Sequence, residues 1–334
     1  MAGMVDTNME DPPHRVVLTG ASGTLGRNFL ELVGNRSDFR VLALLRPHAR
    51  PGGRWSAVEP LAVESLERSA LGIHIARFQP TCLVHCAATG MDFPQTQWFD
   101  LIRFNVDVTI SLCECASAIP GCHFIHVSTG LAYREQGRPL HEKDPLDTLH
   151  PYGASKAAAD MLIRSAAAEF GVPLTVLRPF SFTGIGDDST RLFATLLRAS
   201  AEGTAISLSE GTQIRDHCSA RDIAAGIVAA IQKMPAAAEK SHIYNLGSGQ
   251  LTPLRPLIEN LVDELGLDVS LRFGSRPLGR FEPRHLVADT SLARRELNWQ
   301  PRHNLAHAVW MLARESFPQL PLREPSEAFY EIPR

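Results

Sequence analysis

The sequence predicts a doubly wound α/β fold, in which helices cover both faces of a parallel sheet, with a smaller, discontinuous domain toward the C-terminus. Two observations lead to this prediction. Short apolar runs rich in Val, Leu and Ile alternate with helical segments, and a glycine-rich turn joins the first strand to the first helix. Ligands of such sheets bind at the carboxyl ends of the strands. We therefore expect the functional residues at those ends.

The expected elements follow one another in a regular order. Each strand is a short apolar run, and several end in small or hydroxyl residues. The predicted strands are residues 15–20, 40–45, 81–88, 124–129 and 174–179, and the main helices are residues 24–33 and 99–118. Residues 180–188 read as an irregular segment, whereas residues 222–233 and 242–246 return to the sheet.

The turn after the first strand carries three glycines with the spacing G-x-x-G-x-x-G. Gly20 permits a tight turn, Gly23 allows the backbone to approach a pyrophosphate, and Gly26 allows the next helix to pack closely on the sheet. The N-terminus of that helix would face the phosphates. This arrangement indicates a dinucleotide site.

Arg46 follows the second strand, where the adenosine ribose of a dinucleotide would lie. An acidic residue there would accept hydrogen bonds from both ribose hydroxyls and repel a 2′-phosphate, whereas an arginine can pair with that phosphate. The sequence therefore favours NADP(H) over NAD(H).

Tyr152 and Lys156 lie four residues apart, so on a helix they project from the same face. A lysine cation beside a phenol is expected to stabilise the phenolate and lower the tyrosine pKa. Together in a cleft, the two side chains could transfer a proton to or from an alcohol or ketone oxygen.

Composition excludes several other classes of protein. The chain has 334 residues, 44% of them hydrophobic, and a net charge of −3, which gives no footprint for nucleic acid. No apolar run is long enough for a membrane span, and the six cysteines lack the paired spacing of metal ligands. We expect a soluble cytoplasmic protein with reduced thiols, no metal site, and a mobile N-terminal arm over residues 1–13.

Beyond these local signals, the whole chain resembles the extended short-chain dehydrogenases/reductases of the NAD-dependent epimerase/dehydratase family, which have a Rossmann-type fold and act on nucleotide sugars. The motifs that carry the resemblance run in order along the sequence. They are the glycine turn, His85-Cys-Ala-Ala88, Asn105, Val127-Ser-Thr-Gly-Leu-Ala-Tyr133, Tyr152 with Lys156, Arg178-Pro179, Arg215-Asp216, residues 244–249 and residues 296–301.

The resemblance implies roles for individual residues. Tyr152 would be the general acid, Lys156 its electrostatic activator, and Thr129 the hydrogen-bond donor to the reacting oxygen, with Ser128 as the fallback and Asn105 as a support. The implied cofactor contacts are Gly20, Ser22, Gly23, Thr24, Leu25, Gly26, Arg46, Ala87, Ala88, Lys156 and Phe180. The implied substrate contacts are Thr129, Ser181, Arg215 and Arg276.

Departures from the family pattern narrow the reaction. Gly130 and Leu131 stand where the related dehydratases carry acidic residues, and Leu131 also replaces the cysteine of the 3,5-epimerase/reductases. Of the reactions in this family, simple oxidation or reduction at a carbinol carbon remains. Arg46 favours a net reductase over a 4-epimerase. Ser181 stands in place of an asparagine of the sugar enzymes, and Arg280 falls where a ribose-binding acid is expected, so nucleotide recognition stays open.

The resulting hypothesis is an NADPH-dependent ketoreductase that reduces the 4-keto group of a nucleotide-linked deoxysugar. Alternatives are an NAD-dependent 4-epimerase, a reductase of a non-sugar ketone, and a non-catalytic NADP(H)-sensing protein. We expect a dinucleotide domain over residues 14–183 and 222–250 and a substrate domain over residues 184–221 and 251–334. The helices that begin near Phe99 and Tyr152 resemble a family dimer interface, so we expect a homodimer.

Overall fold

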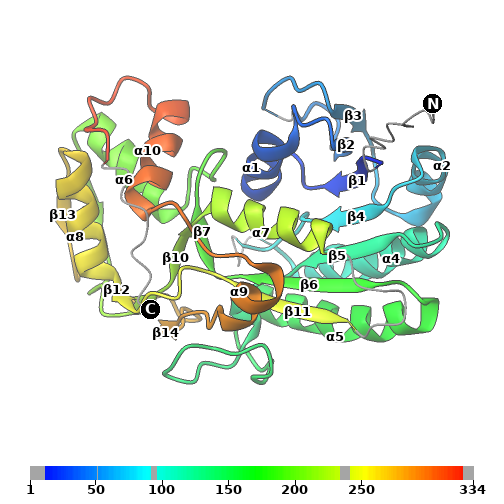
Figure 1. The fold of residues 1–334 in the computed structure, drawn as a ribbon. Helices are drawn as coiled ribbons and strands as arrows, with labels where there is room; N and C mark the ends of the chain where they lie inside the picture. The colour runs from blue at the N-terminus through cyan, green and yellow to red at the C-terminus, as the bar shows by residue number, and fades with distance from the viewer. Residues whose placement is uncertain (1–11, 51, 92–95, 234–240, 326–334) are drawn as a thin grey trace, which may run out of the picture.

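A seven-stranded parallel sheet forms the larger part of the molecule (Figure 1). The structure is a computed structural model that describes residues 12–50, 52–91, 96–233 and 241–325. The predicted arm over residues 1–13 therefore lies almost wholly outside the described residues. The strands stand in the order β3-β2-β1-β4-β5-β6-β11. Their bounds are β1 (His14–Thr19), β2 (Phe39–Leu45), β3 (Val58–Ala62), β4 (Cys82–His85), β5 (His123–Val127), β6 (Leu174–Pro179) and β11 (His242–Leu246).

The strand order reverses between β1 and β4, because the chain first runs outward through β2 and β3 and then returns to pair β4 with β1. Such a reversal opens a crevice at the carboxyl ends of the two central strands, where doubly wound folds bind their ligands. The sheet thus confirms the expected fold class and fixes where a site can form.

Helices cover both faces of the sheet. Val16 and Leu18 pack on one face with helices α1 (Thr24–Val33) and α7 (Ala220–Gln232). Val17, between them in sequence, packs on the opposite face with α2 (Arg68–Phe78), α4 (Val108–Ser117) and α5 (Pro151–Phe170). This alternation follows from the two-residue repeat of a strand, and it explains why the central strands are apolar throughout.

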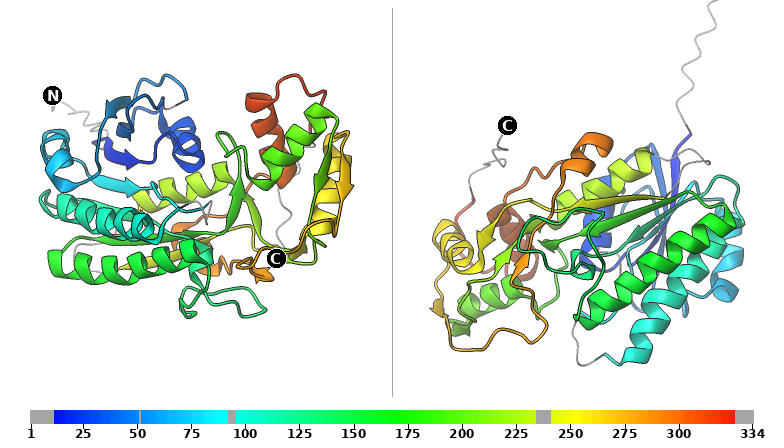
Figure 2. Two further views of the ribbon diagram at one scale, coloured as in Figure 1. Left: turned by 180° about the vertical axis from the view of Figure 1, so that it is seen from behind. Right: turned by 90° about the horizontal axis from the view of Figure 1, so that it is seen from below.

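A second, smaller core lies beside the carboxyl edge of the sheet (Figures 1 and 2). It is formed by α6 (Leu192–Glu202), α8 (Leu254–Leu265) and α10 (Leu305–Ser316) with β8 (Ala205–Ser207) and β13 (Ser270–Arg272). The short strands β9 (Ile214–Arg215), β12 (Thr252–Pro253) and β14 (His285–Leu286) connect this core to the sheet, and α9 (Ser291–Leu297) packs back on β11.

The structure corrects several expected elements. The helix predicted over residues 99–118 consists of α3 (Trp98–Ile102), a π-helical turn (Arg103–Asp107) and α4. Residues 180–188 are not wholly irregular, because β7 (Ser181–Thr183) pairs with β10 (His217–Ser219). The strand predicted over residues 81–88 ends at His85. Neither β3 nor α2 was predicted, since the half-exposed edge strand β3 lacks a continuous apolar run.

Candidate active site

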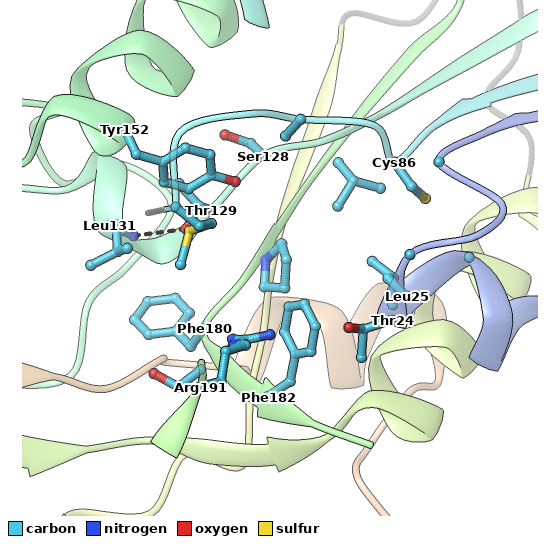
Figure 3. Close-up of a pocket in the computed structure, with 18 of the residues that line it drawn as sticks. Thr24, Leu25, Cys86, Ser128, Thr129, Leu131, Tyr152, Phe180, Phe182 and Arg191 are labelled. Atoms are coloured by element: carbon cyan, nitrogen blue, oxygen red, sulfur yellow. Dashed lines mark hydrogen bonds between the residues drawn. The ribbon is translucent and has the colours of Figure 1, made fainter. Parts of the chain in front are cut away.

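One cavity of about 280 Å³ opens at the carboxyl edge of the sheet (Figure 3). Its walls come from the ends of four parallel strands and from the smaller core. The lining residues include Gly20, Gly23, Thr24, Leu25 and Gly26 after β1, Cys86 and Ala88 after β4, Val127, Ser128 and Thr129 at β5, Pro179, Phe180 and Ser181 at β6, and Tyr152, Arg191 and Leu286. The cavity thus brings together most of the residues singled out in the sequence.

The glycine turn is shaped by the protein's own backbone. Gly20 has a φ of +72°, and a Cβ there would lie 2.7 Å from the Ala87 nitrogen. A Cβ on Gly26 would lie 2.2 Å from the Gly20 carbonyl oxygen. A Cβ on Gly23 would meet only that same oxygen, at 3.4 Å, and would otherwise face open space. Two glycines therefore serve packing, whereas Gly23 opens the backbone to the cavity beside the first amides of α1.

Tyr152 stands at the start of α5, with Pro151 in the first turn and His150 as N-cap. The start of α5 lies close to the segment after β5, because a Cβ on Gly153 would lie 2.2 Å from the Leu131 carbonyl oxygen. The phenol lines the cavity. Burial raises the pKa of Tyr152 to about 12, although the charge of Arg191 opposes this increase. The sequence expectation of a lowered pKa is therefore wrong, because burial outweighs the nearby cations; Tyr152 is protonated at neutral pH.

Lys156 lies one helical turn further along α5 and is fully buried. Its Nζ has no hydrogen-bond partner among the described residues. Burial lowers the pKa of Lys156 to about 8, and Asp160 partly opposes that decrease. The Asp160 carboxylate itself accepts a 2.8 Å bond from the Arg178 guanidinium. Lys156 is thus a buried ammonium one turn from Tyr152, with no protein partner for its donors among the described residues, and it does not itself line the cavity.

The two hydroxyl candidates at the end of β5 both line the cavity but have different neighbours. Thr129 Oγ1 accepts a 3.2 Å bond from the Leu131 amide, as the cap of a short 3₁₀ turn, and still has a proton to donate (Figure 3). Ser128 Oγ has no hydrogen-bond partner among the described residues, and its hydroxyl helps to lower the pKa of the buried Asp160. Both hydroxyls therefore keep a proton to donate, and the choice of Thr129 over Ser128 stays a prediction from the sequence.

Asn105 is buried behind the cavity, in the π-helical turn. Its side chain donates to Ser155 Oγ and to the Thr89 carbonyl oxygen, both at 2.9 Å, and accepts from the Thr89 amide at 3.0 Å. Asn105 thus ties the segment after β4 to α5. It supports both walls of the cavity without lining it.

A second cavity, of about 350 Å³, adjoins the first and shares Leu131, Ser181 and Leu286 with it. Arg215 lines it and forms a 3.1 Å ion pair with Glu282. The remaining lining residues include His150, Arg280 and Phe281. Ser181 therefore lines both cavities, whereas Arg215 lines the second but not the first.

Other predicted contacts lie apart from these cavities. Arg276 is exposed and lines neither one, because the loop after β13 carries it outward. Arg46 is exposed at the end of β2, and Ser22 and Ala87 do not line the first cavity. The Ala87 amide instead donates to Thr19 Oγ1 at 3.3 Å.

The cavities also contain residues that the sequence did not single out. Arg191 and Phe182 line the first cavity, and Glu282 and His150 line the second. None belongs to a recognisable spacing, so only the tertiary fold reveals them. Burial raises the pKa of the Cys86 thiol to about 12, which keeps it protonated.

Comparison with known proteins identifies the family. The profile of the NAD dependent epimerase/dehydratase family matches residues 16–247, which span the sheet, the glycine turn, Tyr152 and Lys156. The chain belongs to this family. Membership confirms the resemblance drawn from the motifs, and with it the class of enzyme: an NAD(P)-dependent oxidoreductase of the extended short-chain type.

Characterised relatives within the family differ in activity. A UDP-glucose 4-epimerase of Lactobacillus helveticus is 26% identical over 86% of this chain and 92% of its own length. A dTDP-6-deoxy-L-talose 4-dehydrogenase (NAD(P)(+)) of Kitasatospora kifunensis is 26% identical over 89% of this chain and 94% of its own length. The crystal structure of a UDP-glucuronic acid 4-epimerase from Bacillus cereus, in complex with UDP-glucuronic acid and NAD, has a TM-score of 0.77 at 22% identity, with 91% of this chain and 99% of that chain covered.

Two further classes find no support in the described part of the chain. No helix there has both the length and the apolar character that a membrane span requires. Nor do the His, Cys, Asp and Glu residues within it gather into a group that could hold a metal ion.

Proposed function

We propose that this protein is an NADPH-dependent ketoreductase that reduces the 4-keto group of a nucleotide-linked sugar, the deoxysugar expected from the sequence being the first to test. One observation carries the proposal. Tyr152, a phenol that is protonated at neutral pH, faces a cavity that has a dinucleotide turn on one side and an arginine-lined cavity on the other. Reduction of a ketone requires a proton donor of this kind.

The residues of the first cavity fit a nicotinamide dinucleotide. Gly23 leaves room for a pyrophosphate at the N-terminus of α1, where no side chain caps the helix amides. The buried Lys156 Nζ, with no protein partner among the described residues, suits the hydroxyls of the nicotinamide ribose. When bound, the cofactor supplies the hydride.

Side chains of the protein then protonate the ketone oxygen and donate a hydrogen bond to it. The Tyr152 hydroxyl donates its proton to that oxygen as negative charge develops on it, and the Thr129 hydroxyl donates a hydrogen bond to the same atom. The phenolate left on Tyr152 is stabilised by the ammonium of Lys156 one turn away. Apolar side chains of Phe180, Phe182 and Leu131 exclude water from this end of the cavity.

Cofactor preference is assigned to Arg46. It is exposed at the end of β2, where its planar guanidinium can reach a 2′-phosphate. Arg46→Ala should weaken NADPH binding about tenfold and leave NADH binding unchanged, as measured by fluorescence titration. Equal binding of NADPH and NADH by the unaltered protein would contradict the assignment.

A 4-epimerase is the second candidate, because a UDP-glucose 4-epimerase is among the relatives that align along most of the chain. An epimerase must first oxidise its substrate, so its tyrosine acts initially as a base. The exposed Arg46, which suits the 2′-phosphate of an exchangeable NADPH, favours the reductase instead.

The deciding experiment is oxidation of NADPH by the purified protein with a panel of carbonyl substrates. The panel should contain a dTDP-linked 4-keto-6-deoxyhexose, UDP-linked 4-keto sugars and simple ketones. Stoichiometric NADPH oxidation with a sugar nucleotide supports the proposal, whereas turnover of simple ketones alone would indicate a non-sugar reductase. Tightly copurifying NAD, with interconversion of sugar epimers and no net oxidation, would establish the epimerase. NADP(H) binding without turnover of any substrate would favour a sensor.

A homodimer through α3 and α5 is part of the same proposal. Large apolar side chains are exposed on these neighbouring helices, namely Trp98, Phe99 and Ile102 on α3 and Met161 and Leu162 on α5. The two helices contact each other, and Figure 2 shows α5 running along the outside of the sheet beside α4. A contiguous apolar surface of this kind suits a second copy of the chain.

A further inference from the structure

Arg191 brings a cation into the reaction cavity from the smaller core. It immediately precedes α6, and Figure 3 shows its side chain rising between Phe180 and Phe182, on the side of the cavity opposite Tyr152. Its positive charge lowers the pKa of the Tyr152 phenol, against the effect of burial. The guanidinium therefore acts at the reacting end of the cavity.

The guanidinium is fixed in place by neighbours. Its Nη1 donates to Asp187 Oδ1 at 2.8 Å, and its Cζ lies 5.2 Å from the centre of the Phe182 ring. The Asp187 side chain is only 1% exposed. Asp187 Oδ2 also accepts a 2.7 Å bond from the Thr183 hydroxyl. An arginine held in this way has already lost much of the freedom that binding a ligand would cost.

Most of the guanidinium donors remain available. A guanidinium has five N–H groups, and Asp187 is the hydrogen-bond partner found for Arg191 within the described residues. The side chain is 32% exposed and lines the cavity. A planar fork of free N–H donors matches the two oxygens of a carboxylate.

The phosphates of a nucleotide sugar have other partners. Arg215 and Arg280 line the adjoining cavity, whereas the glycine turn faces the cofactor phosphates. A substrate that extends through both cavities would place its diphosphate near Arg215 and its reacting ring between Tyr152 and Arg191. The cation at Arg191 therefore points to a negative charge on the ring itself.

We propose that the reacting sugar ring of the substrate carries a carboxylate and that Arg191 binds this group. The inference rests on the proposed function and replaces the deoxysugar by a nucleotide-linked acidic sugar, because a 6-deoxy ring carries a methyl group where a hexuronic acid carries its carboxylate. Asp187 orients Arg191 and also compensates part of its charge, so that the site accepts a planar anion without holding it too strongly for release.

The test compares two sugar nucleotides that differ at one group. UDP-glucuronic acid and UDP-glucose are titrated by calorimetry into the full-length protein saturated with NADP⁺. The acid should bind about tenfold more tightly, as expected for a charge-assisted bidentate pair. Arg191→Gln should remove this preference and leave the affinity for UDP-glucose within about twofold. Arg191→Lys keeps the positive charge but loses the planar pair of guanidinium donors, so it should retain only part of the preference for UDP-glucuronic acid.

Arg77→Gln is the matched control, because it removes the same charge from an exposed position in the last turn of α2 that lines neither cavity. It should leave both affinities unchanged. Equal affinity of the unaltered protein for the two ligands would overturn the inference. So would a loss of NADPH affinity in Arg191→Gln with the sugar preference intact, since Arg191 would then serve the cofactor phosphates.

A third arm separates this inference from the proposed function. If neither sugar nucleotide binds, the nucleotide-sugar assignment fails, and the carboxylate site is tested with 4-oxopentanoate and its methyl ester by saturation-transfer NMR. Preference for the acid that disappears in Arg191→Gln would keep the carboxylate site. Equal binding of acid and ester, or binding of neither, would reject it.

Discussion

The two walls of the reaction cavity are built in different ways. The cofactor-side wall is one continuous turn, Gly20 to Gly26, whose shape depends on backbone packing with no room for side chains at two of its glycines. The opposite wall, where we propose that the substrate binds, is assembled from separate segments that contribute Arg191, Phe182 and Leu286. The glycines of the first wall therefore tolerate few substitutions. In the second wall, single side chains can be replaced one at a time, and each replacement can change which substrate the protein binds.

Tyr152 lies where the two walls meet, and its removal should have the largest effect on turnover. Tyr152→Phe should reduce the rate of NADPH oxidation about 10³-fold, because the proton donor is lost while the packing of the ring is kept. Binding of NADPH and of substrate should stay within about threefold by titration, since neither wall depends on this hydroxyl.

The hydroxyls at the end of β5 provide the control for this experiment. Thr129→Val should slow turnover about 100-fold, as is typical for loss of one donor to a developing oxyanion. Ser128→Ala should have the smaller effect. The opposite ranking would transfer the role to Ser128.

Substitutions in the glycine turn would show whether the cofactor-side wall is as rigid as its packing indicates. Gly26→Ala should lower the stability by about 3 kcal/mol or prevent folding, because its Cβ would lie 2.2 Å from a backbone oxygen. Gly23→Ala should fold with nearly the same melting temperature, since its Cβ faces the cavity, yet bind NADPH more weakly. Calorimetric melting and cofactor titration measure the two effects. Similar stability losses in both variants would contradict the distinction.

The pH dependence of turnover should depend on the pKa of the buried Lys156. Lys156 must carry its proton to stabilise a phenolate, and its pKa is lowered to about 8. Turnover should therefore fall as the pH rises through about 8. Asp160→Asn removes the carboxylate that raises this pKa, so the alkaline limb should move about one unit toward lower pH.

Other groups face Lys156 as well. The Cys86 thiol stays protonated and adds no charge, and His85 and His126 are kept neutral by burial and by the lysine charge. Asp160→Asn also leaves Arg178 without its buried partner, so the melting temperature should fall. The quantity to compare is therefore the pH at which turnover falls on the alkaline side, not the turnover rate itself. Asp263→Asn, an exposed change on α8, should leave the limb unchanged.

The apolar surface of α3 and α5 lies outside both walls, so altering it should have the smallest effect on binding. Phe99→Glu combined with Met161→Glu should convert a dimer into a monomer, because the 68% and 63% exposed side chains would carry charges into the interface. Light scattering after gel filtration measures the mass. A monomeric mass for the unaltered protein at micromolar concentration would reject the dimer.

The two walls of the cavity also differ in how well their residues could be predicted from the sequence. The glycine turn, Tyr152 and Lys156 lie in short local patterns that could be recognised together in the sequence, and the turn and Tyr152 line one cavity, with Lys156 one turn further along α5. Arg191 and Glu282 occupy ordinary positions, and only the packing of α6 and of the loop before β14 brings them to the cavities. The sequence also named Arg276, which the loop carries to the surface.

The fold shows the same limit. Central strands such as β1 and β5 are buried on both faces and read as continuous apolar runs, so their positions were predictable. The edge strand β3 is half exposed, and the π-helical turn around Asn105 depends on contacts with Thr89 and Ser155 that are distant in sequence. The expected pKa of Tyr152 failed for a related reason, because spacing does not reveal how deeply a side chain is buried.

Asp187 contacts residues of both walls of the cavity, Thr24 on one side and Arg191 on the other. Its carboxylate belongs to the segment that leads into α6, yet it accepts a 3.4 Å bond from the Thr24 hydroxyl at the start of α1. The same carboxylate holds Arg191. If α6 swings away from the sheet, the contact with Thr24 breaks and Arg191 leaves the cavity with it. Such a motion would open the cavity and withdraw the proposed carboxylate site in one step.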